Sequence, residues 1–103
     1  MIPTIGRGVI AINLQSNGAN EHPAVITRVW GTGADTRNGP VGVNLCVFAD
    51  LGGTVVKSSV MLYESRQEAE AALASQFRPG PCVAFWPDRV PLPEPAAALA
   101  LAA

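Results

Sequence analysis

The 103-residue sequence contains few charged side chains and no long hydrophobic run. Asp, Glu, Lys and Arg make up only 15% of the chain, and the net charge is −1. A protein that coats nucleic acid needs an excess of basic groups to displace counterions, so the composition argues against bulk nucleic-acid binding. The apolar runs stay well short of the ~20 residues that cross a bilayer, which argues against an integral membrane protein.

Thiol and imidazole ligands are scarce, because the chain has only Cys46, Cys82 and His22. A zinc site needs about four ligands and a disulfide framework needs more cysteines, so we expect no metal and no cofactor. Both cysteines lie in apolar runs, where a free thiol behaves as a small buried hydrophobic group. The N-terminus shows no basic segment with a small-residue cleavage site, and a reducing cytosol is the expected location.

Catalytic patterns are also missing from the sequence. No serine stands in a Gly-x-Ser-x-Gly elbow, and there is no Walker loop, dinucleotide-binding glycine motif or EF-hand pattern. Glu64, Glu68 and Glu70 lie at the start of a predicted helix, where acidic side chains favour the helix dipole. We therefore predict that the protein is not an enzyme.

What the sequence does contain is a series of alternating apolar runs separated by turn residues. Residues 8–14, 23–30, 41–49 and 54–62 alternate with a period of two and predict four strands. Asn17-Gly18 predicts a hairpin turn, and the polar loop over 31–40 is expected to be the most mobile segment. Ser65 and Glu68 form a capping-box pattern before a helix predicted over 66–77, and residues 82–86 predict a fifth strand.

These elements predict an α+β fold of about five strands and one helix. No helix separates the first four strands, so we expect a strongly bent antiparallel sheet or a small open β-barrel, with the helix plugging one side. A single domain is predicted over 1–90, followed by a Pro- and Ala-rich tail over 91–103 that either frays or docks on a partner. The expected core consists of Val25, Val29, Val43, Leu45, Val47, Val56, Val60, Leu62, Leu73 and Phe77.

Large apolar side chains occur on both faces of the second and third predicted strands. A single sheet with one face in water would show cleaner alternation. We therefore expect a homo-oligomer that buries the second face against another copy.

One group of side chains has the chemistry of a binding site. Arg28 and Trp30 are two residues apart on one strand, Asn44 is on the expected neighbouring strand, and His22 and Arg37 complete the candidate site. An arginine beside an indole can hold an anion and stack on a ring, as a nucleotide-like ligand would require. The alternative is structural: Trp30 belongs to the core, Arg28 lies along it, and His22 caps the entry to a strand.

Four segments resemble a family of small uncharacterised proteins of tailed bacteriophages and prophages: residues 22–30 (HPAVITRVW), 43–50 (VNLCVFAD), 58–60 (SSV) and 84–87 (AFWP). The order and spacing of these segments are similar over residues 5–87. The chain lacks the basic helical N-terminal arm of some relatives and has Asp-Leu-Gly-Gly where many have Gly-Asn-Asp, so functions of those parts are not carried over. The resemblance implies a phage origin, and the host cytoplasm or the virion as location, but no reaction.

Three function hypotheses remain for a non-enzymatic phage accessory protein. The first is an anti-defence binder, an oligomeric sponge that sequesters a nucleotide immune signal with Arg28 on phosphate and Trp30 on a base. The second is a virion subunit, such as a capsid decoration or a head–tail or tail accessory protein, and the third is a structural partner of a phage replication enzyme. Six of the seven basic residues are arginine, which favours the first because arginine binds phosphate through paired hydrogen bonds.

Overall fold

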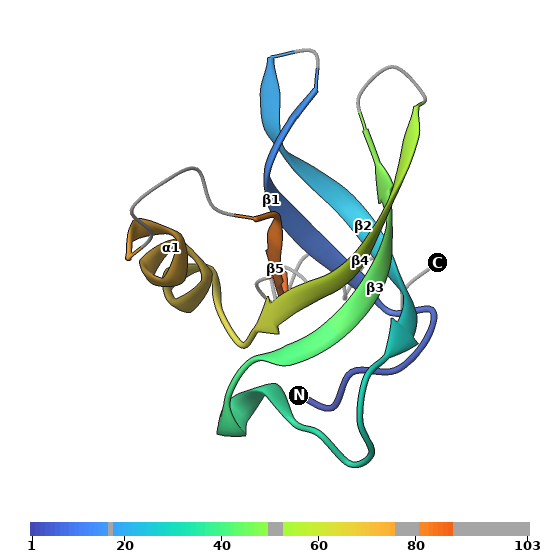
Figure 1. Ribbon diagram of the computed structural model, residues 1–103, viewed down its shortest axis with the longest axis vertical. Coiled ribbons are helices and arrows are strands. Elements are labelled where there is room, and N and C mark those ends of the chain that lie inside the picture. Colours follow the sequence, from blue (N-terminus) through green and yellow to red (C-terminus); the bar gives the residue numbers. More distant parts are fainter. Residues whose placement is uncertain (17, 50–52, 76–80, 88–103) are drawn as a thin grey trace, which may run out of the picture.

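The computed structural model describes residues 1–16, 18–49, 53–75 and 81–87, which form a closed β-barrel with one α-helix on its outside (Figure 1). This confirms the predicted α+β fold of about five strands. The tail over 91–103 lies outside the described residues. In chain order the elements are β1 (Gly8–Ser16), β2 (Ala19–Val29), the 3-10 helix η1 (Thr36–Asn38), β3 (Val41–Phe48), β4 (Thr54–Tyr63), α1 (Arg66–Ala74) and β5 (Val83–Phe85).

The barrel closes because its last strand pairs on both sides. β1 to β4 form an antiparallel meander, and β5 then pairs parallel to β4 and antiparallel to β1. A parallel pair needs a crossover connection, which α1 supplies between β4 and β5. The barrel is therefore mixed rather than purely antiparallel, and closure pairs the two strands that would otherwise form open edges.

Short-range sequence signals explain how the first hairpin and the helix begin. Ser16 pairs with Ala19, so the β1–β2 turn lies where it was predicted, and Gly18 adopts the positive φ of 80° that glycine tolerates. The Ser65 hydroxyl accepts a 3.2 Å hydrogen bond from the amide of Glu68, which confirms Ser65 as the N-cap of α1. α1 ends at Ala74, and the last two residues of the predicted helix lie outside the described residues.

Two hydrophobic clusters stabilise the fold, one inside the barrel and one under the helix. The inner cluster contains inward side chains of all five strands together with Trp86. The outer cluster packs α1 against the outside of the barrel and comprises Ile12, Ala69, Val83 and Phe85. The helix thus covers an outer face instead of plugging the barrel as expected. Its first turn is fastened to β2 by Arg66, whose guanidinium donates to the Glu21 carboxylate at 2.6 and 2.9 Å.

Two β-bulges reverse the inward and outward sides of β2 and β4 part-way along each strand. The β2–β3 pairing shifts between Ile26 and Arg28, and the β3–β4 pairing shifts at the same level of the barrel. A bulge inserts one residue, so the side chains beyond it point to the opposite face. In β4, Val56 lies before the bulge and is 77% exposed, whereas Val60 lies beyond it and is buried.

These bulges explain where the predicted core was wrong. Val56 points outward, and in β2 the buried apolar side chains are Ala24 and Ile26 rather than Val25. Val29 and Leu73 are partly buried against the inner and outer clusters, and Phe77 lies outside the described residues. The predicted core residues that are fully buried are Val43, Leu45, Val47, Val60 and Leu62.

Leu45 and Val56 provide a direct test of this arrangement. Leu45→Ala removes a side chain with no exposed surface and should lower the free energy of unfolding by about 2–5 kcal/mol. Val56→Ala changes a mostly exposed side chain and should alter it by less than about 0.5 kcal/mol. Chemical denaturation measures both values. Similar losses in the two variants would mean that β4 alternates without a bulge.

Candidate functional site

Asn44 is the polar centre of the outer face of the barrel. It lies on β3 between the buried residues Val43 and Leu45, so strand alternation directs its side chain outward. Its Oδ1 atom accepts two hydrogen bonds, one of 3.0 Å from the backbone N–H of Ser59 and one of 2.9 Å from the indole Nε1 of Trp30. Ser59 is in the β4 bulge and has a positive φ of 56°, where the backbone pairing of β3 and β4 is irregular. Asn44 therefore supplies the hydrogen-bond acceptor for the Ser59 amide.

Trp30 and Arg28 lie on the same outer surface and stack on each other. The backbone N–H of Trp30 donates to the carbonyl oxygen of Gly42 at 2.9 Å. The indole packs over Gly42, where a Cβ atom would lie in ordinary van der Waals contact, 3.5 Å from Trp30 Cδ1. The guanidinium carbon of Arg28 is 3.9 Å from the centre of the indole, which is a cation–π contact, and Trp30 remains 43% exposed.

The bonding pattern of this Arg28–Trp30–Asn44 surface leaves specific groups open to a ligand. The Arg28 guanidinium forms no ion pair with any carboxylate of the described residues, so its N–H groups remain for an external anion. The indole N–H is committed to Asn44, which fixes the ring and leaves its exposed surface as a stacking platform. A guanidinium plane can also extend such a stack, as it does in base recognition.

His22 and Arg37 do not join this surface, although the sequence placed them in the same candidate site. His22 is 2% exposed, and its Nε2–H donates to the carbonyl oxygen of Leu14 at 2.7 Å. Leu14 lies where the β1–β2 pairing is irregular, so the imidazole replaces a missing ladder bond. Arg37 lies in η1 and donates three hydrogen bonds of 2.7–3.2 Å to the Asp35 carboxylate. The structure therefore brings together three of the five predicted residues.

Thr36 is the centre of a buried polar hub that no sequence pattern predicted. The hub also contains Asp35, Glu64, Trp86 and the amino group of Met1. Thr36 is 2% exposed, and its hydroxyl accepts a 2.8 Å hydrogen bond from the indole Nε1 of Trp86. The same hydroxyl lies 2.6 Å from a carboxylate oxygen of Glu64. The amino group of Met1 contacts the carboxylates of Glu64 and Asp35 at 3.0 Å. These contacts anchor the middle of the loop over 31–40, which had been expected to be mobile.

The two carboxyl groups of this hub, those of Asp35 and Glu64, are held in the ionised form. Hydrogen bonds from the Arg37 side chain and amide keep the pKa of Asp35 well below its usual range. The hydroxyl of Thr36 lowers the pKa of Glu64, and the amino group of Met1 adds to this effect. Asp35 is the N-cap of η1, because its side chain accepts a hydrogen bond from the amide of Arg37. Aspartate is a preferred N-cap residue, so this was the one local signal for the hub in the sequence.

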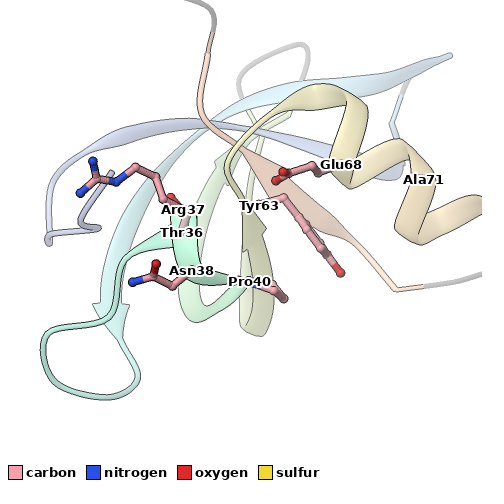
Figure 2. Close-up of a pocket in the computed structure, with 8 residues that line it drawn as sticks. Thr36, Arg37, Asn38, Pro40, Tyr63, Glu68 and Ala71 are labelled. Atoms are coloured by element: carbon pink, nitrogen blue, oxygen red, sulfur yellow. The ribbon is translucent and has the colours of Figure 1, made fainter.

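An open pocket of about 470 Å³ lies next to the hub (Figure 2). Its walls come from η1, the residues before β3, the end of β4 and the first turns of α1. Its volume is in the range of small-molecule sites. Of the residues predicted as a binding site, Arg37 alone lines it. The lining residues are Thr36, Arg37, Asn38, Gly39, Pro40, Tyr63, Glu68 and Ala71.

The chain matches no protein-family model, no curated protein and no solved structure. Among the described residues, no helix combines the length and the apolar character needed to cross a membrane. Within the same residues, no group of three His, Cys, Asp or Glu side chains is arranged to hold a metal ion. Cys46 and Cys82 are free, half-buried thiols, and burial raises the pKa of Cys82.

Substitution of Asn44 tests whether its oxygen supports the site. Asn44→Ala leaves the Ser59 amide and the Trp30 indole without their acceptor and should lower the free energy of unfolding by about 1–3 kcal/mol. Asn44→Asp keeps an oxygen at the same place and should retain most of the stability. Thermal denaturation of the two variants makes the comparison. Equal losses in both would show that the accepted hydrogen bonds are not what Asn44 contributes.

Proposed function

We propose that this protein is a non-enzymatic accessory protein of a bacteriophage that binds an anionic, ring-bearing small molecule of the nucleotide class on the Arg28–Trp30–Asn44 surface. The observation that supports this proposal most directly is the position of the Arg28 guanidinium, 3.9 Å from the centre of the exposed Trp30 indole. This guanidinium forms no ion pair with a carboxylate of the described residues. A guanidinium provides paired hydrogen bonds for a phosphate, and an indole provides a stacking surface for a base.

The surface is also held in place before any ligand arrives. Asn44 fixes the edge of the indole, and Gly42 fixes the backbone of Trp30. The indole in turn positions Arg28. Binding to groups that are already ordered loses less conformational entropy than binding to free side chains, which favours a recognition role for this surface.

The proposed biological role is the sequestration of a nucleotide immune signal. The two sequence segments that carry most of the resemblance to phage proteins, 22–30 and 43–50, contain Arg28, Trp30 and Asn44. A protein that sequesters a signal needs affinity and no turnover, and an arginine–indole stack supplies affinity without a nucleophile. Release of a nucleotide from the denatured, purified protein, detected by mass spectrometry, would identify the ligand.

Arg28 provides the decisive variant for this proposal. In calorimetric titrations with a panel of mononucleotides and cyclic oligonucleotides, Arg28→Gln should weaken binding by about ten- to a hundredfold, because a charge-assisted contact is lost. Arg28→Lys should recover only part of the affinity, because the planar fork is lost. Arg37→Gln is the matched control, since Arg37 is exposed but already bound to Asp35.

Chemical denaturation of the same variants separates binding from folding. Arg28→Gln should remain folded and lower the free energy of unfolding by no more than about 1 kcal/mol, because only an exposed cation–π contact is lost. Unchanged affinity in a folded Arg28→Gln variant would contradict the proposal, as would loss of binding in Arg37→Gln alone. Failure of the unaltered protein to bind any nucleotide of the panel would contradict it as well.

We also propose that the protein forms a homo-oligomer. Val25, Cys46 and Val56 pair across three neighbouring strands as an outward-facing apolar row, and Phe48 lies near its end with 45% of its surface exposed. None of these side chains is charged, so a second copy could cover the row without burying an ion.

Analytical ultracentrifugation tests this assembly. The expected mass is a multiple of 10.7 kDa at the concentrations of the binding assay. Val56→Glu should shift the protein towards the monomer, because it would bury a charge in the contact. Ile5→Glu is the control, since Ile5 is 71% exposed on the segment before β1. A monomer before any substitution would contradict the proposal.

A virion subunit is the second candidate function, and the same apolar row favours it. An uncharged row on the outside of a rigid barrel could equally dock on a capsid or tail protein. Detection of the protein in purified particles of its phage would favour this candidate. Co-purification of a nucleotide with the free protein would favour the first.

A further inference from the structure

The pocket beside α1 is lined by an aromatic residue and by a carboxylate that has no ion partner among the described residues. Glu68 lies in the first turn of α1 and Tyr63 ends β4, and both line the pocket of about 470 Å³ (Figure 2). The Glu68 Oε2 atom accepts a 3.2 Å hydrogen bond from the amide of Glu64, which places the carboxylate beside the backbone that follows Tyr63. Pro40 and Ala71 complete the apolar part of the wall.

No cation of the described residues neutralises Glu68. Arg37 lines the same pocket, but its guanidinium is bound to Asp35 and is directed away from Tyr63 and Glu68 (Figure 2). Arg66, in the same helical turn as Glu68, is occupied by Glu21 and Glu70. A carboxylate offers about four acceptor positions, and the amide of Glu64 uses one of those on Glu68.

A second place in the same protein combines a carboxylate and an aromatic ring, and a guanidinium contacts both of them. The Arg66 guanidinium lies 4.6 Å from the centre of the Phe85 ring and donates to both oxygens of the Glu21 carboxylate. A carboxylate and a ring therefore hold a guanidinium between them on the other side of α1's first turn. In the pocket, Glu68 and Tyr63 supply a carboxylate and a ring again, and no guanidinium of the described residues pairs with them.

We propose that this pocket binds the guanidinium group of an external ligand, with its plane on Tyr63 and its N–H groups on Glu68. A guanidinium is favoured over an ammonium because it is planar, weakly hydrated and able to donate to both oxygens of a carboxylate. The group is carried either by a small free guanidine compound or by an arginine side chain of a protein partner. The site is independent of the proposed nucleotide surface, since it takes a ligand of opposite charge on other residues.

Tyr63 gives a direct readout, because it is the only tyrosine in the chain. Titration with agmatine, which carries one guanidinium and one ammonium group, should move the ring resonances of Tyr63 in carbon–proton NMR spectra along a saturable curve. 1,4-Diaminobutane, in which an ammonium replaces that guanidinium at the same total charge, should bind more weakly. Sodium chloride at matched ionic strength should cause no saturable shift.

Glu68→Gln is the decisive variant, because glutamine keeps an oxygen for the Glu64 amide and suits the capping box while removing the charge. It should weaken agmatine binding by about tenfold or more. Glu70→Gln is the matched control on the same helix, since Glu70 does not line the pocket. Its affinity for agmatine should equal that of the unaltered protein.

Titrations with two peptides distinguish a protein partner from a small molecule as the source of the guanidinium. A short peptide with one central arginine that binds more tightly than agmatine would support a protein partner, and the reverse order would support a free small molecule. The lysine version of the peptide should bind more weakly in either case. The proposal is overturned if agmatine and the arginine peptide both leave the Tyr63 resonances unmoved, or if Glu68→Gln and Glu70→Gln weaken binding equally.

Discussion

The side-chain oxygen of Asn44 accepts hydrogen bonds from the bulged Ser59 amide and from the Trp30 indole, and the shape of the barrel depends on this shared acceptor. A barrel of five strands must bend its strands sharply, and bulges provide the bend at the expense of regular backbone pairing. Asn44 faces bulges on both neighbouring strands and satisfies the amide that one of them frees. The same contact orients the outer surface, because the indole that it fixes is the one on which Arg28 stacks.

Side chains that replace lost backbone bonds recur in this small barrel. His22 donates to the carbonyl of Leu14 at the irregularity of the β1–β2 pair, and Asn13, with a positive φ of 67°, donates to the carbonyl of Pro81. At the other end of the barrel, Thr36 connects the loop after β2 with Trp86 beyond β5. Buried or half-buried polar groups without partners would destabilise the fold, so these few polar residues occupy the places where strand geometry is irregular.

The sequence allowed the strands, the first turn and the helix cap to be predicted because their signals are local. Asn17-Gly18 and Ser65 act within a few residues, and alternation is visible inside each strand. The bulges were not predictable in this way, because an inserted residue is defined by its register with another strand. His22 has the same sequence parity as Arg28 and Trp30, and regular alternation would have put all three on one face. The β2 bulge lies between them, so His22 is buried while the other two point outward. The contacts of Thr36 with Glu64 and Trp86 span 28 and 50 residues and left no local pattern.

Both candidate sites keep a charge without an ion partner among the described residues, and the fold stabilises each charge by other means. Arg28 has the electron-rich face of an indole beneath it, which favours a cation without neutralising it. Glu68 has the amide of Glu64 and the first turn of α1, where the helix dipole favours a negative group. An ion pair with a neighbouring side chain would stabilise either group more strongly, but it would also occupy the hydrogen-bonding positions that a ligand needs. The two proposals therefore rest on the same combination, an available charge beside a ring that is exposed in Trp30 and half-buried in Tyr63.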